Sequence, residues 1–475
     1  MAGIPFLGGI GPGRSVAAAP QRRINLYPEI IQSADLPPKV ILHGTPGLTL
    51  FCNNGANPTR GQHTLGDYTY QVTAGTFYQI NNAGTATAKG TLNTTSGYVS
   101  MADNGTQIML VDGTDGYVYT PGTDTWSGAL GSPFSTYNSD TVIFADGYFA
   151  VNNPGSGRWY ISALYDGTSW DVLDVATAES LPDNLATLIA DNGQVWLLGD
   201  GSTEVWFNSG DADFPFRRIA GANIEWGIKA KRSIAKVDNR IAWLANPPGG
   251  GGAQVVINAG YNVDRISDHA LESRIAQFST VGDAVAYGYA EEGHYFYVLT
   301  FPTGNATFVW DAATKEWHER SSSPLAQGRH RGQTYTYFNG YHLVGDYASG
   351  KIYRLVNGVY DENGETLRAE VRVKVNGMRG RKVAHKRLSV DLDTGVGLVS
   401  GQGSDPQVML SWSDDGGRTF GNEHWKKLGA IGEFGRRVRW SRLGSSRDRV
   451  YKIAITDPVQ RTFKGAELDA EELAG

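Results

Sequence analysis

The sequence predicts an all-β protein with three parts: an extended N-terminal arm, a β-propeller of six or seven blades, and a C-terminal β-sandwich-like domain. Three observations predict this fold class. Hairpin-like units recur through the middle of the chain, strands of strictly alternating pattern follow them, and the first residues are too rich in Gly and Pro for long regular elements. The predicted limits are residues 1–44 for the arm, 45–360 for the propeller and 361–475 for the sandwich-like domain with an acidic tail.

The propeller prediction depends on a unit of two apolar-aromatic strands joined by a turn rich in Gly, Asp or Asn. The successive pairs of strands span residues 68–72 and 76–80, 107–111 and 116–119, 147–151 and 158–161, 194–198 and 203–207, 239–243 and 253–257, 294–298 and 306–310, and 340–344 and 350–354. One hairpin cannot bury its own apolar face, so strand repeats of about 40–50 residues indicate blades closed into a ring.

The sandwich prediction depends on period-two patterns after the polar break at residues 361–368. Alternating strands are expected at residues 369–375, 386–393, 407–412, 436–440 and 449–455, with apolar side chains on one face and charged ones on the other. Five such strands in about 100 residues are typical of a small β-sandwich. Short helices are expected only near Asp268–Gln277 and Gly465–Glu472.

Composition narrows the functional classes. The 475 residues include 12 Trp, 23 Tyr and 61 Gly, as expected for many short strands and turns. The single cysteine, Cys52, excludes a disulfide within the chain and a multi-cysteine metal cage. No secretory h-region and no apolar run of membrane-spanning length is evident, so we expect a protein made in a cytoplasm without a membrane span.

The net charge differs between the parts of the chain. Residues 1–365 carry 22 Lys and Arg against 34 Asp and Glu, whereas residues 366–464 carry 20 against 10, and the last eleven residues add four acids. The middle of the chain is therefore net acidic and the C-terminal domain net basic. Such an asymmetry points to an anionic partner for the basic part.

The basic part contains the candidate docking residues. Arg436, Arg437 and Arg439 belong to a cluster that continues with Arg442, Arg447 and Arg449. In an extended strand, Arg437 and Arg439 share one face, opposite Val438 and Trp440. The alternatives are a solvated sheet face and a surface that contacts an acidic protein or DNA phosphates.

A second candidate is a turn that matches the Asp-box pattern, Ser-x-Asp-x-Gly-x-Thr-aromatic. Its residues are Ser413, Asp415, Gly417, Thr419 and Phe420. The Ser and Asp side chains are expected to bond backbone amides, so the role predicted for this turn is structural and not catalytic.

The other groups of residues do not predict a catalytic or metal site. The nine histidines are not at metal-ligand spacing, and Arg329-His330-Arg331 is either a solvated loop or a small anion site. The Gly-rich stretch at residues 9–14 lacks the strand and helix that a phosphate-binding loop needs. We predict no catalytic residues, no metal and no cofactor.

The order of these motifs resembles the tail-hub proteins of short-tailed bacteriophages, also called nozzle or packaged-DNA stabilisation proteins. The resemblance rests on Asn25-Leu-Tyr-Pro, on Gly44-Thr-Pro-Gly-Leu, on the hairpins, and on the segment 410–421 that precedes an Arg-rich strand and a final Tyr-Lys-Ile strand. It covers nearly the whole chain.

The resemblance implies a non-enzymatic virion protein of the tail. It implies a homohexameric ring below the portal and head-to-tail adaptor that continues the DNA channel, retains packaged DNA and supports a tip, needle or fibres. Genomic DNA would pass without sequence-specific binding. The alternatives are a carbohydrate-binding adhesin, whose exposed aromatic residues would stack on sugars, and a glycan-acting propeller enzyme.

Overall fold

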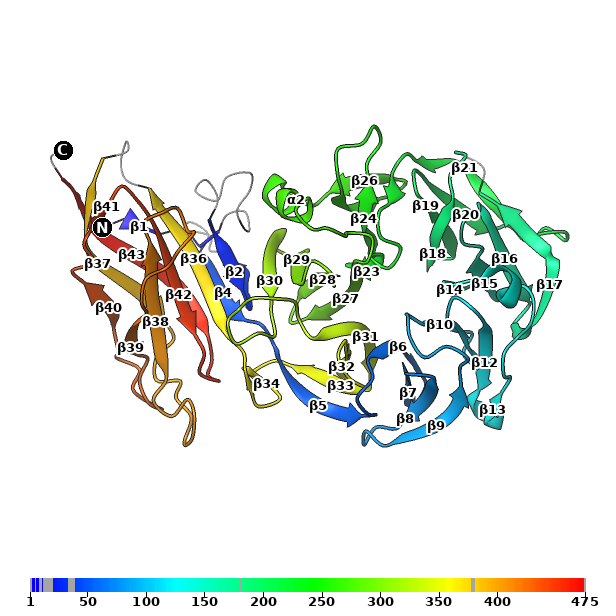
Figure 1. Ribbon diagram of the computed structural model, residues 1–475, viewed down its shortest axis with the longest axis horizontal. Coiled ribbons are helices and arrows are strands. Elements are labelled where there is room, and N and C mark those ends of the chain that lie inside the picture. Colours follow the sequence, from blue (N-terminus) through cyan, green and yellow to red (C-terminus); the bar gives the residue numbers. More distant parts are fainter. Residues whose placement is uncertain are drawn as a thin grey trace.

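The computed structural model describes residues 2–4, 6–7, 11, 20–32, 39–178, 181–376 and 381–473. It consists of a ring of β-sheets beside a β-sandwich, so the predicted fold class is confirmed (Figure 1). Helices are few. The described residues contain a short 3-10 helix, η1 (Pro121–Thr123), and the helices α1 (Phe134–Tyr137) and α2 (His269–Ile275).

Seven blades follow one another around the ring in the described residues (Figure 1). Each is an antiparallel sheet with four main strands, and the fifth blade carries one strand more. The first blade consists of β6 (Thr59–Leu65), β7 (Tyr68–Thr73), β8 (Thr76–Ile80) and β9 (Ala86–Thr91), and the second of β10 (Ser100–Asp103), β11 (Ile108–Val111), β12 (Gly116–Thr120) and β13 (Thr125–Trp126). The third consists of β14 (Val142–Ala145), β15 (Tyr148–Asn152), β16 (Arg158–Ala163) and β17 (Asp166–Thr177). The fourth consists of β18 (Leu185–Asp191), β19 (Gln194–Gly199), β20 (Thr203–Asn208) and β21 (Phe216–Ile224).

The last three blades complete the ring. The fifth blade consists of β22 (Gly227–Ile228), β23 (Ala235–Val237), β24 (Arg240–Asn246), β25 (Gln254–Ala259) and β26 (Asn262–Arg265). The sixth consists of β27 (Val285–Glu291), β28 (His294–Phe301), β29 (Ala306–Asp311) and β30 (Glu316–Arg320). The seventh consists of β31 (Gly332–Phe338), β32 (Tyr341–Asp346) and β33 (Lys351–Val356) together with β5 (Gly47–Asn53). The ring closes because β5, from the N-terminal side, supplies the fourth strand of the seventh blade by pairing antiparallel with β33.

The seven predicted hairpins are the middle two strands of the seven blades. Turn residues also explain how the first strand of some blades pairs with the second. Asn192-Gly193 joins β18 to β19 and Asn339-Gly340 joins β31 to β32, with positive φ at all four residues. Asn-Gly is the pair that favours a tight hairpin turn with this backbone geometry.

Apolar side chains of neighbouring blades pack against one another. The described residues contain one buried cluster between each pair of adjacent blades, such as Tyr70, Val72 and Phe77 of the first blade against Ile108 and Leu110 of the second. A separate buried cluster fills the sandwich. Each blade is therefore stabilised by burial against both of its neighbours.

The sandwich has two sheets. One sheet has the order β3 (Leu26–Ile31), β4 (Lys39–Gly44), β43 (Thr462–Glu472), β37 (Val383–Leu392) and β40 (Val438–Ser441), with β1 (Ala2–Gly3) on β43 and β41 (Ser445–Ser446) on β37. The other contains β2 (Arg22–Ile24), β36 (Ala369–Asn376), β42 (Asp448–Ile455), β38 (Gln407–Ser413) and β39 (His424–Lys427). Two short strands, β34 (Asp361–Glu362) and β35 (Glu365–Thr366), pair beside β5 at the propeller edge.

The two predicted helices and the predicted N-terminal arm differ in outcome. The helix predicted at Gly465–Glu472 is wrong, because these residues belong to β43, which pairs along β37 and so extends the sheet. The helix predicted near Asp268–Gln277 is confirmed as α2. The segment predicted as an arm holds β2, β3 and β4, which pair with strands of the sandwich sheets; the three domain limits themselves stay predictions.

The propeller and the sandwich share one continuous sheet. The outer strand β30 of the sixth blade pairs parallel with β2 through Ile24 and Glu319, and β2 pairs antiparallel with β36 of the sandwich. The N-terminal segment thus lies between the two halves of the molecule and joins them through backbone hydrogen bonds.

Candidate docking surface

The predicted docking arginines lie at one end strand of the first sandwich sheet. β40 buries Val438 and Trp440 in the sandwich core, and Arg439 between them is exposed, as the period-two pattern requires. Arg436 and Arg437 precede the strand and are also exposed. The Nη2 atom of Arg436 lies 2.9 Å from Oε2 of Glu433.

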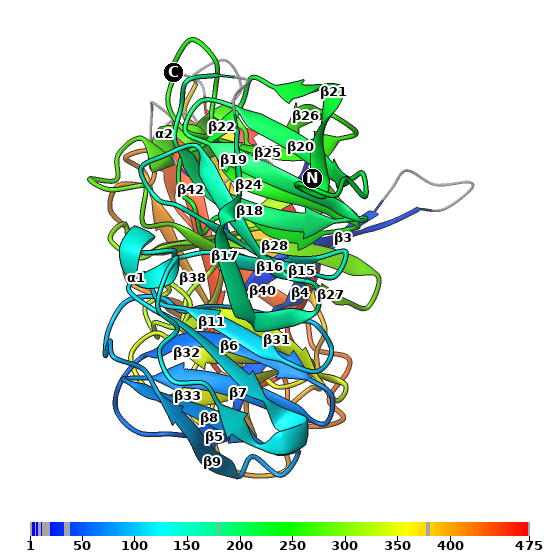
Figure 2. The same ribbon diagram turned by 90° about the vertical axis from the view of Figure 1, so that its right-hand side faces the viewer.

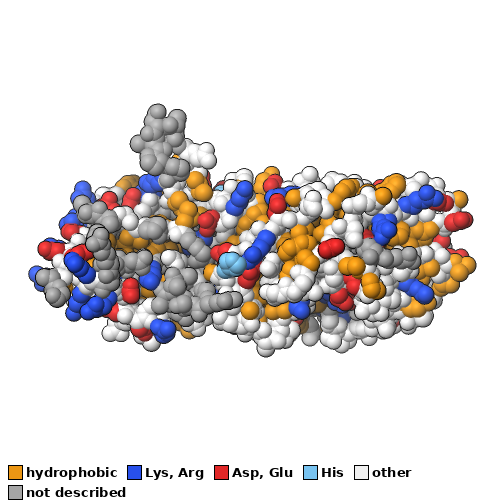
Figure 3. All heavy atoms as spheres, turned by 90° about the horizontal axis from the view of Figure 1, so that it is seen from above, with side chains coloured by type: hydrophobic (Ala, Val, Ile, Leu, Met, Phe, Trp, Pro, Cys, Tyr) orange, Lys and Arg blue, Asp and Glu red, His pale blue; other side chains and the backbone are white. Residues whose placement is uncertain are grey.

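These arginines border a groove of about 690 Å³. Residues of β37 and β43, among them Val390 and Ala466, belong to its lining, and Ile4 and Val40 line it from the N-terminal part of the chain. Pairing of β1 and β4 with β43 brings residues from both ends of the chain to this site. Several Lys and Arg side chains lie at the sandwich end of the molecule as seen from above (Figure 3).

The groove is lined by more cations than anions. Five lysines and arginines line it, against two carboxylates; the cations are Lys39, Arg436, Arg437, Arg439 and Lys464, and the acids are Asp391 and Glu467. Lys464 contacts Asp393 at 3.0 Å, and this contact raises the pKa of its ammonium group. Sequence reasoning missed Lys39 and Lys464, because only the strand pairing places them beside the arginines.

The rest of the predicted basic cluster does not join the groove. Arg449 is buried, donates to both carboxylate oxygens of Asp414 at 2.7 and 2.8 Å, and also donates to the Leu443 carbonyl. Arg442 has a positive φ in the turn after β40. The cluster that looks continuous in sequence is therefore divided between exposed arginines at the groove and a buried Arg449 that pairs with the exposed Asp414.

The Asp-box segment forms a closed turn after β38. The Asp415 carboxylate accepts hydrogen bonds from the backbone N–H groups of Arg418 and Thr419 and from the Thr419 hydroxyl, while Ser413 Oγ accepts from the Gly417 N–H. Bonds from Ser413 and Thr419 hold the pKa of Asp415 well below its usual range. Phe420 lies under Lys452 and Arg372, with 4.5 and 5.0 Å to its ring centroid.

The seam between β30 and β2 is held by a buried ion-pair network. Glu319 receives two hydrogen bonds from Arg22, at 2.8 and 2.6 Å, and one from Arg274 at 2.9 Å. Burial alone would raise the pKa of Glu319, but the two arginines outweigh it and the pKa is well below its usual range. The seam therefore requires an ionised carboxylate.

Asn25 is the second link at the seam. Its side-chain amide donates to the carbonyls of Ser321 and Arg368 and accepts from the Ser321 N–H, so that it bonds propeller and sandwich at once. Its φ is +55°, a conformation that Asn tolerates better than most residues. These contacts explain the first residue of the Asn25-Leu-Tyr-Pro motif, since Asn25 bonds to both domains.

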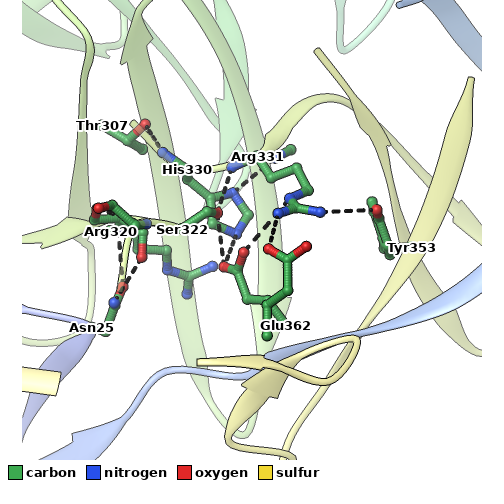
Figure 4. Close-up of polar contacts among 12 residues, drawn as sticks. Asn25, Thr307, Arg320, Ser322, His330, Arg331, Tyr353 and Glu362 are labelled. Atoms are coloured by element: carbon green, nitrogen blue, oxygen red, sulfur yellow. Dashed lines mark hydrogen bonds and ion pairs between the residues drawn. The ribbon is translucent and has the colours of Figure 1, made fainter. Parts of the chain in front are cut away.

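A buried polar cluster lies beside this link (Figure 4). Glu362 of β34 accepts a hydrogen bond from Ser322 at 2.8 Å and lies 3.9 Å from His330 and 3.8 Å from Arg331. Burial raises the pKa of Glu362 to about 7, and burial together with Arg320 and Arg331 lowers the pKa of His330 to about 3.

The alternative of a solvated loop at Arg329-His330-Arg331 is wrong for its central residue. His330 is 3 % exposed because it packs beneath the β34 segment, and the anion beside it is Glu362 of the same chain. Arg331 also donates to Glu365 and to the Tyr353 hydroxyl. The cluster therefore ties the last blade to the segment that leads into the sandwich.

The described part of the chain contains no group of three or more His, Cys, Asp or Glu residues that could hold a metal ion. It also contains no helix long and apolar enough to cross a membrane.

The described residues thus form a seven-bladed ring joined to a sandwich that carries a basic groove. Two family models match the chain. The β-propeller model of bacteriophage P22 Gp10 matches residues 4–360, and its β-sandwich model matches residues 373–471. The chain belongs to the bacteriophage P22 Gp10 family of phage stabilisation and tail-hub proteins.

Two solved structures are remotely similar to this chain. The computationally designed Ika8 protein matches with a TM-score of 0.41 and 9 % identity, over 65 % of this chain and 100 % of that one. The extracellular domain of the putative one-component system BT4673 from B. thetaiotaomicron matches with a TM-score of 0.43 and 10 % identity, over 87 % of this chain and 58 % of that one. No curated protein matches.

Proposed function

We propose that this protein forms the tail hub of a short-tailed phage, as a homohexameric ring below the portal and adaptor. In this role it continues the DNA channel, retains packaged DNA and lets it pass at ejection without sequence-specific contacts. The observation that carries the proposal is that the phage stabilisation family matches both the propeller and the sandwich.

The charge distribution supports the two tasks of such a ring. Residues 1–365 have twelve more acids than bases, and a net-negative wall repels the DNA backbone and so does not hold it during ejection. The basic groove of the sandwich suits the opposite task, which is to bind an acidic protein surface. Its partner is a neighbouring subunit or the adaptor, and tip, needle or fibre proteins attach to the completed ring.

Charge reversal tests the docking role. The triple variant Arg436→Glu, Arg437→Glu, Arg439→Glu alters exposed side chains, so we expect a folded protein that no longer enters tails in a complementation assay. The matched control is Arg217→Glu, Lys229→Glu, Lys315→Glu, which changes the charge equally at exposed propeller positions. Incorporation of the groove variant at the level of the control would contradict docking through the groove.

A further inference from the structure

The outer strand of the third blade carries an irregularity that points away from the ring. Tyr160 of β16 pairs with Val175 of β17, and Ser162 pairs with Trp170. Four residues of β17, Asp171-Val172-Leu173-Asp174, therefore lie opposite the single residue between them on β16. A bulge of this kind bends the edge strand and re-aims its side chains.

This bulge, called the knob below, is both apolar and acidic. Leu173 is 81 % exposed and Val172 is 47 % exposed, although both are large hydrophobic residues. Asp171 accepts a hydrogen bond from the Leu173 N–H at 2.9 Å, which holds the turn. The described residues provide no ion pair for Asp171 or Asp174, and burial together with the nearby charge of Asp171 raises the pKa of Asp174.

The knob and the groove are at opposite ends of the molecule. β17 is the outermost element at the propeller end and faces the viewer in Figure 2, whereas β37, β40 and β43 lie at the sandwich end (Figure 1). The knob of one copy consequently cannot reach the groove of the same copy. Two such surfaces on one chain can meet only between copies.

The two surfaces complement each other in chemistry. The knob offers two carboxylates flanking two exposed aliphatic side chains, and the lining of the groove combines the half-buried apolar residues Leu7 and Val40 with Arg437 and Arg439. No ion pair of either arginine is present within the described residues. Charge complementarity of this kind fixes the register of an interface and excludes wrong partners.

We propose that the knob of one copy, Asp171–Asp174, docks in the Arg437–Arg439 groove of the next copy. The inference rests on the proposed function, since it names the partner of the same groove. The contact is heterologous, because different surfaces of the two copies meet, and such contacts generate a closed ring or an open filament according to the rotation between subunits.

A charge-swap experiment tests the pairing. The knob variant is Asp171→Lys, Asp174→Lys, and the groove variant is Arg437→Glu, Arg439→Glu; the control for the knob is Asp67→Lys, Asp213→Lys at exposed acids elsewhere. Self-association of the full chain is measured by sedimentation velocity at about 50 mM salt. We expect each variant alone to associate at least tenfold more weakly than the wild type and the control.

The decisive arm mixes the knob variant with the groove variant. The reversed knob then faces the reversed groove, and we expect the mixture to associate more tightly than either variant alone. Leu173→Ser should weaken association without changing charge, and circular dichroism verifies that each variant is folded. Wild-type association by both variants, a monomeric wild type, or a mixture no better than its components would each overturn the pairing.

The outcomes also separate this inference from the proposed function. Loss of tail incorporation by the groove variant, together with normal incorporation by the knob variant, would retain the groove as a docking site and exclude the knob as its occupant. Normal incorporation by both variants would contradict docking through the groove and the pairing with the knob, while still showing that the protein is a component of the tail.

Discussion

Replacing Glu319 by Gln should lower the free energy of unfolding by weakening the seam between the propeller and the sandwich. Glu319 sits on β30 at the single register pair with β2, and its side chain is 6 % exposed. The substitution keeps the size of the side chain but removes the charge that Arg22 and Arg274 share. Both arginines then remain largely buried, with 19 % and 15 % of their side chains exposed and no carboxylate between them.

The expected cost follows from the burial of the three charges. Breaking a buried ion pair by removing one partner costs about 3–5 kcal/mol. Because both arginines retain some exposure, the lower part of this range applies, and about 3 kcal/mol corresponds to roughly a 100-fold change in the folding equilibrium. Since the pKa of Glu319 is lowered in the folded state, this stabilisation is present at neutral pH and is lost as the pH falls below its ordinary value of 4.5.

Urea unfolding followed by tryptophan fluorescence measures the effect, and amide exchange in Arg22–Ile24 shows whether the seam opens first. The matched control is Glu365→Gln, because Glu365 pairs with Arg331 but is 62 % exposed, and such a pair contributes at most about 1 kcal/mol. A loss below about 1 kcal/mol for Glu319→Gln, or equal losses for the two variants, would refute the reasoning.

Three further predictions concern the neighbouring polar sites. Burial raises the pKa of Glu362 to about 7, so its carboxyl should lower the stability of the protein as the pH rises from about 4.5 to about 7. The Glu362→Gln variant should lack this loss when unfolding is compared at pH 5 and pH 8. An equal pH dependence of stability in the variant and the wild type would contradict the prediction. Asn25→Ala should lower the melting temperature more than Asn25→Gly does. Both variants lose the hydrogen bonds to Ser321 and Arg368, but only Ala is strained at φ +55°. Equal losses of stability in the two variants would argue against backbone strain. Asp415→Ala should speed amide exchange at Arg418 and Thr419 while β38 keeps its protection, and unchanged exchange would show that the carboxylate does not hold the turn.

The sequence predicts the blades well because their signals are local. Each hairpin carries its own alternation, and turn residues such as Asn192-Gly193, which joins the first two strands of the fourth blade, are equally local, so neither signal needs information from elsewhere in the chain. The same holds for β40, where Val438 and Trp440 are buried and Arg439 is exposed. Closure by β5 could not be predicted, because its pairing with β33 joins residues about 300 positions apart.

The groove and the seam show why long-range pairing limits such predictions. Lys39 and Lys464 meet the predicted arginines only because β4 and β43 share a sheet. Gly465–Glu472 has the composition of a short acidic helix, yet pairing with β37 makes it a strand. Arg449 belongs to the basic run in sequence, but its side chain is buried and pairs with Asp414 of another turn. In each case tertiary contacts override the local pattern.

The central claim is tested most directly by virions that carry an early stop codon in this gene. Electron microscopy and an assay of encapsidated DNA on the purified particles would be compared with wild type. The tail-hub account predicts heads that fill with DNA, lack the tail stub and leak their genome. Intact particles that retain their DNA and fail only to adsorb to cells would contradict it and favour an adhesin or a glycan-acting enzyme.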